Sequence, residues 1–140
     1  MKRNRPLEHF SRDHHVALVV AQRLKRTAEA SAEDACSVFL RYWRSDGRRH
    51  FREEEELLLP TFAGFGDLEA PVVAQVLVDH VRIRRLVVEI ASGTPELSTL
   101  RVLGTLLEQH VRREERELFP LIEGVVPERE LARLAALLDN

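Results

Sequence analysis

Apolar residues recur along this chain at the three- and four-residue spacing of amphipathic helices, and nowhere do they alternate with a period of two. The pattern predicts four long helices followed by a short fifth one, and no strands. Prolines and glycines mark most of the boundaries, because proline suits the first turn of a helix and disrupts its interior. The predicted helices span about residues 11–30, 32–61, 70–92, 94–120 and 127–138.

The start of the fourth long helix is the most clearly marked, since Thr94 is a good N-cap and Pro95 suits the first helical position. Short connections should make successive long helices run antiparallel. The sequence therefore predicts an all-α fold, an up-down-up-down four-helix bundle with a short fifth C-terminal helix. We expect a single domain over residues 1–140, with a basic N-terminal tail over 1–8, a bundle over about 10–122 and a C-terminal helix over about 127–138.

An internal repeat links the second and fourth long helices. The segment HFREEEELLLP at 50–60 aligns without a gap with HVRREERELFP at 110–120, and Asp13-His14 matches Asp79-His80 more weakly at an offset of 66. The bundle is therefore expected to consist of two similar helical hairpins.

Six histidines occur, and one falls near the inner face of each long helix. In the first helix the stripe through His14 is apolar and the stripe through His15 is polar, which points His14 inward and places His15 on a flank. His50, His80 and His110 also accompany apolar stripes. Counted from the predicted helix ends at about 1.5 Å per residue, the four inner imidazoles fall within one or two turns of a common level.

Two carboxylates join this level. Glu54 and Glu114 each follow a histidine by four residues, a spacing that puts both side chains on one helical face. One histidine on an apolar face is usually a satisfied core residue, but two glutamates buried beside four histidines without a metal would be costly. Imidazole combined with carboxylate suits iron, and helix bundles build sites for two iron ions in this way. The candidate metal ligands are His14, His50, Glu54, His80, His110 and Glu114.

Composition narrows the functional classes. A net charge of −2 gives no general attraction to nucleic acid or to an anionic membrane. The single cysteine, Cys36, excludes an internal disulfide framework and a cysteine-rich zinc site, which favours a reducing, cytoplasmic location. No apolar run reaches the ~18 residues of a membrane helix, and the basic start leads into no signal-peptide core. We expect neither a nucleic-acid nor a membrane partner, and the oligomeric state stays open.

Taken together, four motifs resemble the hemerythrin-like family, also called the HHE cation-binding domain. They are Asp13-His14, His50-x3-Glu54, Asp79-His80 and His110-x3-Glu114, supported by the block ends LLP at 58–60 and LFP at 118–120. The resemblance covers about residues 10–122 and implies a non-haem centre of two iron ions with an oxo or hydroxo bridge. It further implies that the four histidines are terminal ligands and that Glu54 and Glu114 bridge the two irons.

The chain departs from the oxygen-carrying members of that family. They use a fifth histidine four residues from the first on the third helix, where this chain has Val76 or Arg84 beside His80. They also place an acid five residues after the last histidine, where this chain has Glu115. Glu115 is therefore an alternative ligand to Glu114, and His15 is one to His14. The wider family includes proteins linked to oxygen or iron sensing and to nitric oxide or peroxide responses.

A count of ligands leads to a functional hypothesis. If two irons share four imidazoles, two bridging carboxylates and a solvent-derived bridge, each keeps one open position for O2, NO or peroxide. An additional ligand such as His15, Glu53 or Tyr42 would close that position. The main hypothesis is a metal-binding protein that binds a small diatomic ligand, or that senses or stores oxygen or iron. The alternative is a small redox enzyme acting on peroxide or NO, so enzymatic activity stays open.

Overall fold

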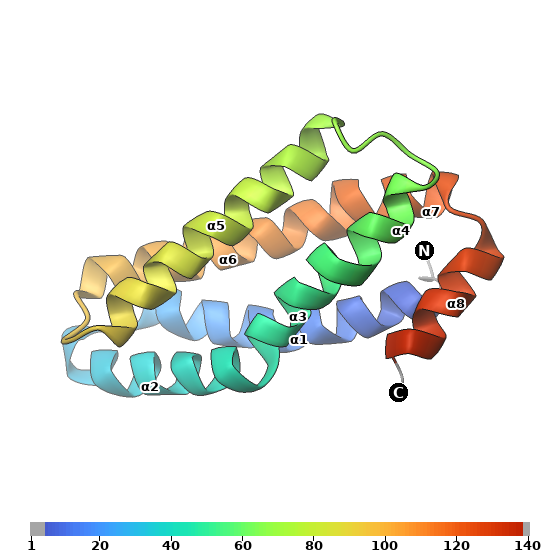
Figure 1. The fold of residues 1–140 in the computed structure, drawn as a ribbon. Coiled ribbons are helices and arrows are strands. Elements are labelled where there is room, and N and C mark those ends of the chain that lie inside the picture. Colours follow the sequence, from blue (N-terminus) through green and yellow to red (C-terminus); the bar gives the residue numbers. More distant parts are fainter. Residues whose placement is uncertain (1–4, 139–140) are drawn as a thin grey trace.

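The computed structural model describes residues 5–138, and every regular element in that range is helical, with no strand (Figure 1). The predicted all-helical class is thus confirmed. None of the helices in this range combines the length and apolar character needed to cross a bilayer. In chain order the elements are α1 (Arg5–Arg26), the 3₁₀ turn η1 (Glu29–Ser31), α2 (Ala32–Tyr42), η2 (Trp43–Gly47), α3 (Arg48–Glu53), η3 (Glu54–Leu58), α4 (Leu59–Ala63), α5 (Pro71–Ala91), α6 (Leu97–Arg113), η4 (Glu114–Leu118), α7 (Phe119–Val125) and α8 (Glu128–Leu138).

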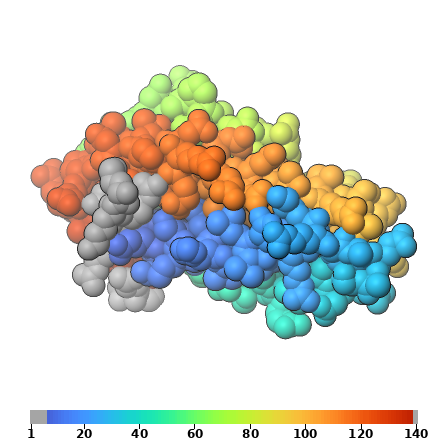
Figure 2. All heavy atoms as spheres, turned by 180° about the vertical axis from the view of Figure 1, so that it is seen from behind, coloured from blue at the N-terminus to red at the C-terminus, as the bar shows by residue number. Residues whose placement is uncertain are grey.

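These elements join into four long helical runs, namely α1, residues 32–63, α5 and residues 97–125. Figure 1 shows successive runs crossing the molecule in alternate directions, with α8 placed against α1. α6 packs against both α1 and α5. Seen from behind, α1 and α6 lie side by side along the molecule (Figure 2).

The first helix begins earlier than the sequence pattern predicted. α1 starts at Arg5 because Leu7 and Phe10 are fully buried and extend its apolar stripe toward the N-terminus. Residues 5–8, expected to lie in a basic tail, are therefore helical. Residues 1–4 of that predicted tail lie outside the described residues.

The same helix also ends earlier than predicted. α1 stops at Arg26 rather than near residue 30, and the short turn η1 follows it. The Arg101 guanidinium donates two hydrogen bonds, of 2.9 and 3.2 Å, to the carbonyl oxygen of Thr27. This side chain satisfies a carbonyl that the helix end leaves unpaired.

The predicted cap of the fourth run is wrong. Thr94 and Pro95 precede the helix, and Glu96 with extended backbone angles is the N-cap of α6. The helix begins at Leu97, and the Leu100 amide donates the first bond, of 3.1 Å, to the Glu96 carbonyl.

Three turns, η2, η3 and η4, are π-helical, and two of them begin at a candidate ligand. The Leu59 amide donates to the Glu54 carbonyl, and the Phe119 amide donates to the Glu114 carbonyl, each spanning five residues. In both runs the next residue is a proline. A proline inside a regular α-helix clashes with the carbonyl four residues before it, and the wider turn relieves this clash.

This local geometry corrects another prediction. The fourth run does not end near Pro120 but continues through α7 to Val125. A proline pattern alone cannot show that a π-turn precedes the proline and lets the helix continue.

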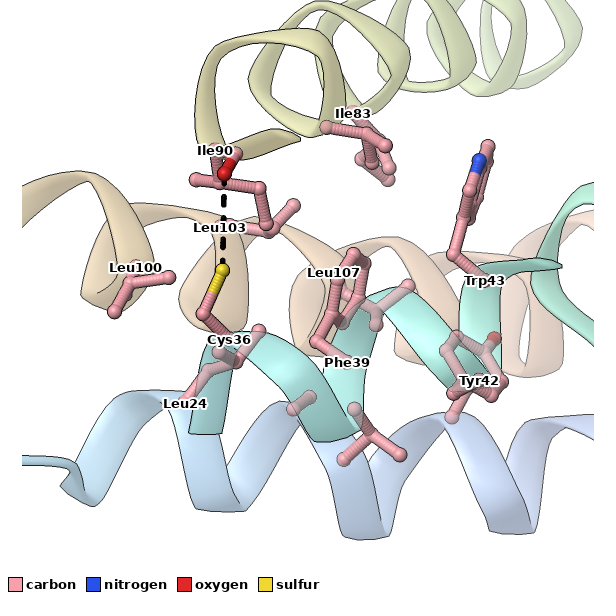
Figure 3. Packing of buried hydrophobic residues seen from close by; sticks show 14 of the residues in the cluster. Leu24, Cys36, Phe39, Tyr42, Trp43, Ile83, Ile90, Leu100, Leu103 and Leu107 are labelled. Carbon is pink, nitrogen blue, oxygen red and sulfur yellow. Dashed lines mark hydrogen bonds between the residues drawn. The ribbon is translucent and has the colours of Figure 1, made fainter. Parts of the chain in front are cut away.

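Two apolar clusters fill the interior, one on each side of a polar layer that the six candidate ligands form. The α2 cluster includes Leu24, Phe39, Ile83, Leu103 and Leu107 (Figure 3). The α8 cluster includes Phe10, Phe62, Val73, Phe119 and Leu131. Along each of the four runs, the candidate ligands lie between residues of these two clusters. A fully buried Leu or Phe stabilises the fold by about 1.5–3 kcal/mol, so both clusters fix the helices that carry the polar layer.

Gly104 lies where α6 crosses α1 at close range. A Cβ at this position would lie 2.7 Å from the Ala21 carbonyl oxygen and 2.9 Å from the Lys25 amide nitrogen. Both are backbone atoms, which cannot turn aside as the end of a flexible side chain can. Glycine in a helix costs about 1 kcal/mol relative to alanine, and the close crossing explains its presence here.

Candidate metal centre

The structure brings all six predicted ligands into the polar layer between the clusters, one or two from each run. The side chains of His14, His50, Glu54, His80, His110 and Glu114 are all buried, and both glutamates are 0% exposed. Their role as ligands stays a prediction, and their convergence gives it a geometric basis.

Glu54 contacts one imidazole from its own helical run and one from another. Its Oε2 lies 3.1 Å from His50 Nε2, one helical turn away. Its Oε1 lies 3.1 Å from His80 Nε2 on α5. The carboxylate therefore stands between two imidazoles.

Glu114 repeats this arrangement in the other run. Its Oε2 lies 3.3 Å from His110 Nε2, and its Oε1 lies 2.8 Å from His14 Nε2 on α1. All four Nε2 atoms thus face one of the two central carboxylates.

The ligand atoms form two groups, each of which could hold a metal ion, with its atoms within 4.8 Å of one another. One group has the imidazoles of His14 and His50, the other has those of His80 and His110, and both include Glu54 and Glu114. In each glutamate one oxygen faces the first group and the other oxygen faces the second. This is the arrangement that a carboxylate bridging two metal ions requires.

Four buried atoms at the centre approach each other in two pairs, at 3.1 and 3.3 Å, but make no aligned hydrogen bond among the described residues. They are Nε2 of His50, Nε2 of His110, Oε2 of Glu54 and Oε2 of Glu114. Buried polar atoms are nearly always paired, because an unpaired one costs about 1–3 kcal/mol. Two nitrogens and two oxygens that converge on one centre without an aligned hydrogen bond are a donor set that a metal cation satisfies.

A second carboxylate lies behind each imidazole. These four outer carboxylates accept hydrogen bonds from Nδ1 in the pairs His14–Glu115 (2.6 Å), His50–Asp13 (3.0 Å), His80–Glu55 (2.5 Å) and His110–Asp79 (3.1 Å). An ionised carboxylate can only accept, so Nδ1 carries the proton. The lone pair of a neutral imidazole then lies on Nε2, the atom that faces the centre.

The outer carboxylates have polar partners of their own. The pairs are Arg49 with Asp13, Arg84 with Glu55, Arg113 with Asp79, and the Ser11 hydroxyl with Glu115. These partners fix the carboxylates, and the carboxylates fix the imidazole planes.

Aromatic rings fix two imidazoles from their faces. The Phe51 ring stacks on His80 with the centroids 4.0 Å apart, and the Phe119 ring stacks on His14 at 5.3 Å. Each of these imidazoles is therefore held both at Nδ1 and across its ring.

Without a cation, the central groups share protons. Burial alone lowers the pKa of an imidazole, but the surrounding carboxylates outweigh burial and raise the pKa of His50 and His80 well above 6.5. Burial raises the pKa of Glu114, but His110 and two further imidazoles lower it to well below its usual value. These raised pKa values favour a proton on the inner Nε2 atoms of His50 and His80, at the positions that a metal ion would take.

The structure places the residues of the two open ligand choices differently. His14 is buried in the layer and His15 is exposed on the outer side of α1. Glu114 lies at the centre, whereas Glu115 bonds to His14 from behind.

The suggested additional ligands lie elsewhere. The Glu53 carboxylate pairs with His9 and Arg49, and Tyr42 belongs to the α2 cluster. Arg84 pairs with Glu55, and Cys36 is buried in the α2 cluster, where its thiol donates to the Ile90 carbonyl at 3.7 Å (Figure 3).

The supporting role of the outer carboxylates was not predicted from the sequence. A signal was present, because an aspartate directly precedes His14 and His80, and a glutamate directly follows Glu54 and Glu114. However, these neighbours support imidazoles on other helices, and sequence spacing alone does not show such pairings.

Comparison with known proteins agrees with this geometry. Neither the curated proteins nor the solved structures gave a match to this chain. The family model described as the hemerythrin HHE cation binding domain matches residues 5–122, which include every residue of the centre. The chain therefore belongs to the hemerythrin HHE cation-binding domain family.

Proposed function

We propose that this protein holds two iron ions in its polar layer and binds a small diatomic ligand, O2 or NO, at that centre. In this proposal the four helical runs form the up-down-up-down bundle of hemerythrin-like proteins. The observation that carries the proposal is the convergence of four Nε2 atoms on two buried carboxylates. Two of these nitrogens and one oxygen of each carboxylate make no aligned hydrogen bond.

The donor set divides evenly between two ions. His14 and His50 would hold one ion, His80 and His110 the other, and Glu54 and Glu114 would hold both. Nitrogen and oxygen donors in this ratio suit iron, whereas a cysteine-rich set would favour zinc. When bound, iron supplies a redox-active centre with coordination positions that O2 or NO can take.

The chain's own residues prepare the site for such an ion. The outer carboxylates keep the proton on Nδ1 and thereby direct the Nε2 lone pairs inward. The two apolar clusters exclude bulk water above and below the layer. Carboxylate-rich bundle sites of the ferritin type use Glu-x-x-His pairs, and the histidine-rich set here favours reversible binding of a small ligand over oxidation of a substrate.

The test is metal analysis together with absorption spectroscopy. Freshly purified protein should contain about two irons per chain, and His50→Ala and His110→Ala should each lose most of the metal. His15→Ala is the matched control, because this histidine is exposed beside His14 and should leave the metal content unchanged. Azide should change the charge-transfer bands of the oxidised protein, and NO those of the reduced protein.

Several outcomes would contradict the proposal. One zinc ion per chain, or full metal content in both alanine variants, would exclude the two-iron centre. Steady turnover of peroxide or NO with a reductant would replace ligand binding by the enzymatic alternative.

A further inference from the structure

The internal repeat pairs Asp13 and three side chains near it with four residues at the matching positions in the other half of the molecule. We call residues 5–63 the first half and residues 71–125 the second half. The alignment pairs His9 with Gln75, Asp13 with Asp79, Arg49 with Gln109, and Glu53 with Arg113. Only the aspartate is the same in both sets.

The second half shows what support of an imidazole requires. Besides His110, Asp79 bonds to Arg113 and to the Gln75 amide at 2.9 Å. No histidine and no second carboxylate is needed for this task. His9 and Glu53 in the first half are therefore additional to it.

We propose that His9, Asp13 and Glu53 form an outer cation site, which takes a divalent metal ion from solvent before it passes to the inner centre. Their ligand atoms lie within 4.8 Å of one another. His9 Nε2 lies 2.9 Å from Glu53 Oε1 and 3.7 Å from Asp13 Oδ2. One imidazole with two carboxylates suits Fe²⁺ and Co²⁺. The passage of the ion to the inner centre rests on the proposed function, whereas its binding to the three outer ligands does not.

The outer cluster is accessible where the inner centre is not. The side chains of His9, Asp13 and Glu53 are 16–18% exposed, whereas the central glutamates are fully buried. A hydrated ion can therefore meet these three ligands at the surface, exchange part of its water for them and approach the interior partly dehydrated.

In the metal-free protein the Arg49 guanidinium neutralises part of the negative charge of this cluster. Its guanidinium donates to Glu53 Oε1 at 2.6 Å and to Asp13 Oδ1 at 3.0 Å. The two carboxylates carry one more negative charge than Arg49 neutralises, so this cluster can take a cation, while Arg44, Arg48 and Arg52 line the hollow beside Glu53. The Arg49 side chain is 39% exposed, so it can turn toward solvent when an ion replaces it.

One imidazole ring separates the outer site from the inner centre. Asp13 Oδ2 belongs to the outer cluster and also accepts the hydrogen bond from His50 Nδ1 at 3.0 Å. The opposite nitrogen of that ring, Nε2, faces Glu54. Within residues 5–138, no comparable group of potential ligands accompanies Asp79, so the structure assigns the arrival of metal to the first half.

Cobalt uptake by metal-free protein tests this assignment. In equilibrium dialysis against Co²⁺, wild type should bind three ions per chain, and His9→Ala and Glu53→Gln should each bind two. In stopped-flow absorbance measurements, both variants should fill the inner pair about tenfold more slowly than wild type and reach the same final occupancy. Arg49→Gln should bind the third ion several-fold more tightly, because it removes the competing cation.

Glu56→Gln is the matched control, since it removes one exposed carboxylate from the same helical run and should change neither quantity. Two ions in wild type, with unchanged uptake rates in both variants, would overturn the outer site and leave the inner centre intact. A single ion that is lost in Glu53→Gln and kept in His50→Ala would support the outer site and overturn the two-iron centre. A charge effect alone would slow Glu56→Gln as much as Glu53→Gln and would also overturn the proposal.

Discussion

The two halves of the bundle present the same inner ligands but surround their outer aspartates differently. Asp79 is 1% exposed and is closed in by Arg113 and Gln75. Asp13 is 16% exposed and shares its Arg49 partner with a second carboxylate. The second half thus encloses the aspartate that supports its imidazole, whereas the first half leaves the corresponding aspartate open to solvent.

This difference shows that one repeated motif can keep its chemistry at the centre while its surroundings diverge. The inner spacing of His50 to Glu54 equals that of His110 to Glu114, and both pairs reach the same layer. What changes is the polar side chain behind each imidazole. Two metal positions with equal donor sets therefore need not exchange metal equally.

The largest expected effect concerns what the halves share. Metal-free protein should be less stable than metal-loaded protein by about 4 kcal/mol when free metal exceeds its dissociation constant about a thousandfold. For a chain of this length the melting temperature should fall by roughly 10–15 °C. Calorimetry of loaded and chelated protein measures this shift. Equal melting temperatures would mean that the buried layer binds no metal.

The difference in melting temperature between metal-loaded and metal-free protein should also depend on pH. Because the pKa values of His50 and His80 are raised in the metal-free fold, their protons stabilise it fully below about pH 6.5 and progressively less as the pH rises above that value. In the loaded protein the metal replaces the inner protons, so higher pH favours it. The difference in melting temperature should therefore widen from pH 6 to pH 8. A gap that narrows over this range would contradict the proton sharing.

The next effect separates the two halves. Asp79→Ala should lower the free energy of unfolding by about 3 kcal/mol, because it leaves the buried His110 and the Arg113 guanidinium without their acceptor. Asp13→Ala also leaves the buried His50 Nδ1 without its acceptor, but it should cost less, about 2 kcal/mol, because Arg49 is half-exposed and keeps Glu53 as a partner. Urea unfolding of metal-free protein compares the two. Equal losses would show that the halves enclose their aspartates alike.

The centre itself was predictable from the sequence because it depends on regular geometry. Four-residue spacing places His50 with Glu54 and His110 with Glu114, and helix length sets the common level. The all-helical class followed in the same way from apolar periodicity.

The outer carboxylates were not predictable because they act between helices. Glu55 lies in a run of four glutamates that resembles a solvated surface, yet it supports His80 on α5. That pairing depends on how far two helices slide and turn against each other, which sequence periodicity leaves undetermined. The same holds for the passage of the helix through Pro120, which depends on a local π-turn.

The smallest effect tests where the halves meet, at the crossing of α1 and α6. Gly104→Ala should destabilise the protein by about 1–2 kcal/mol, although alanine is the better helix former by about 1 kcal/mol. The added methyl group would press on the Ala21 carbonyl at 2.7 Å and force the two helices apart. Gly124 lies in the same helical run, and a Cβ added there would meet no atom of the described residues within 4 Å, so Gly124→Ala should stabilise the protein by about 0.5–1 kcal/mol. Urea unfolding should therefore show changes in the free energy of unfolding of opposite sign for the two variants, which would identify the crossing as a point of close helix contact. Stabilisation by both substitutions would show that α1 can move away from α6 without loss of stability.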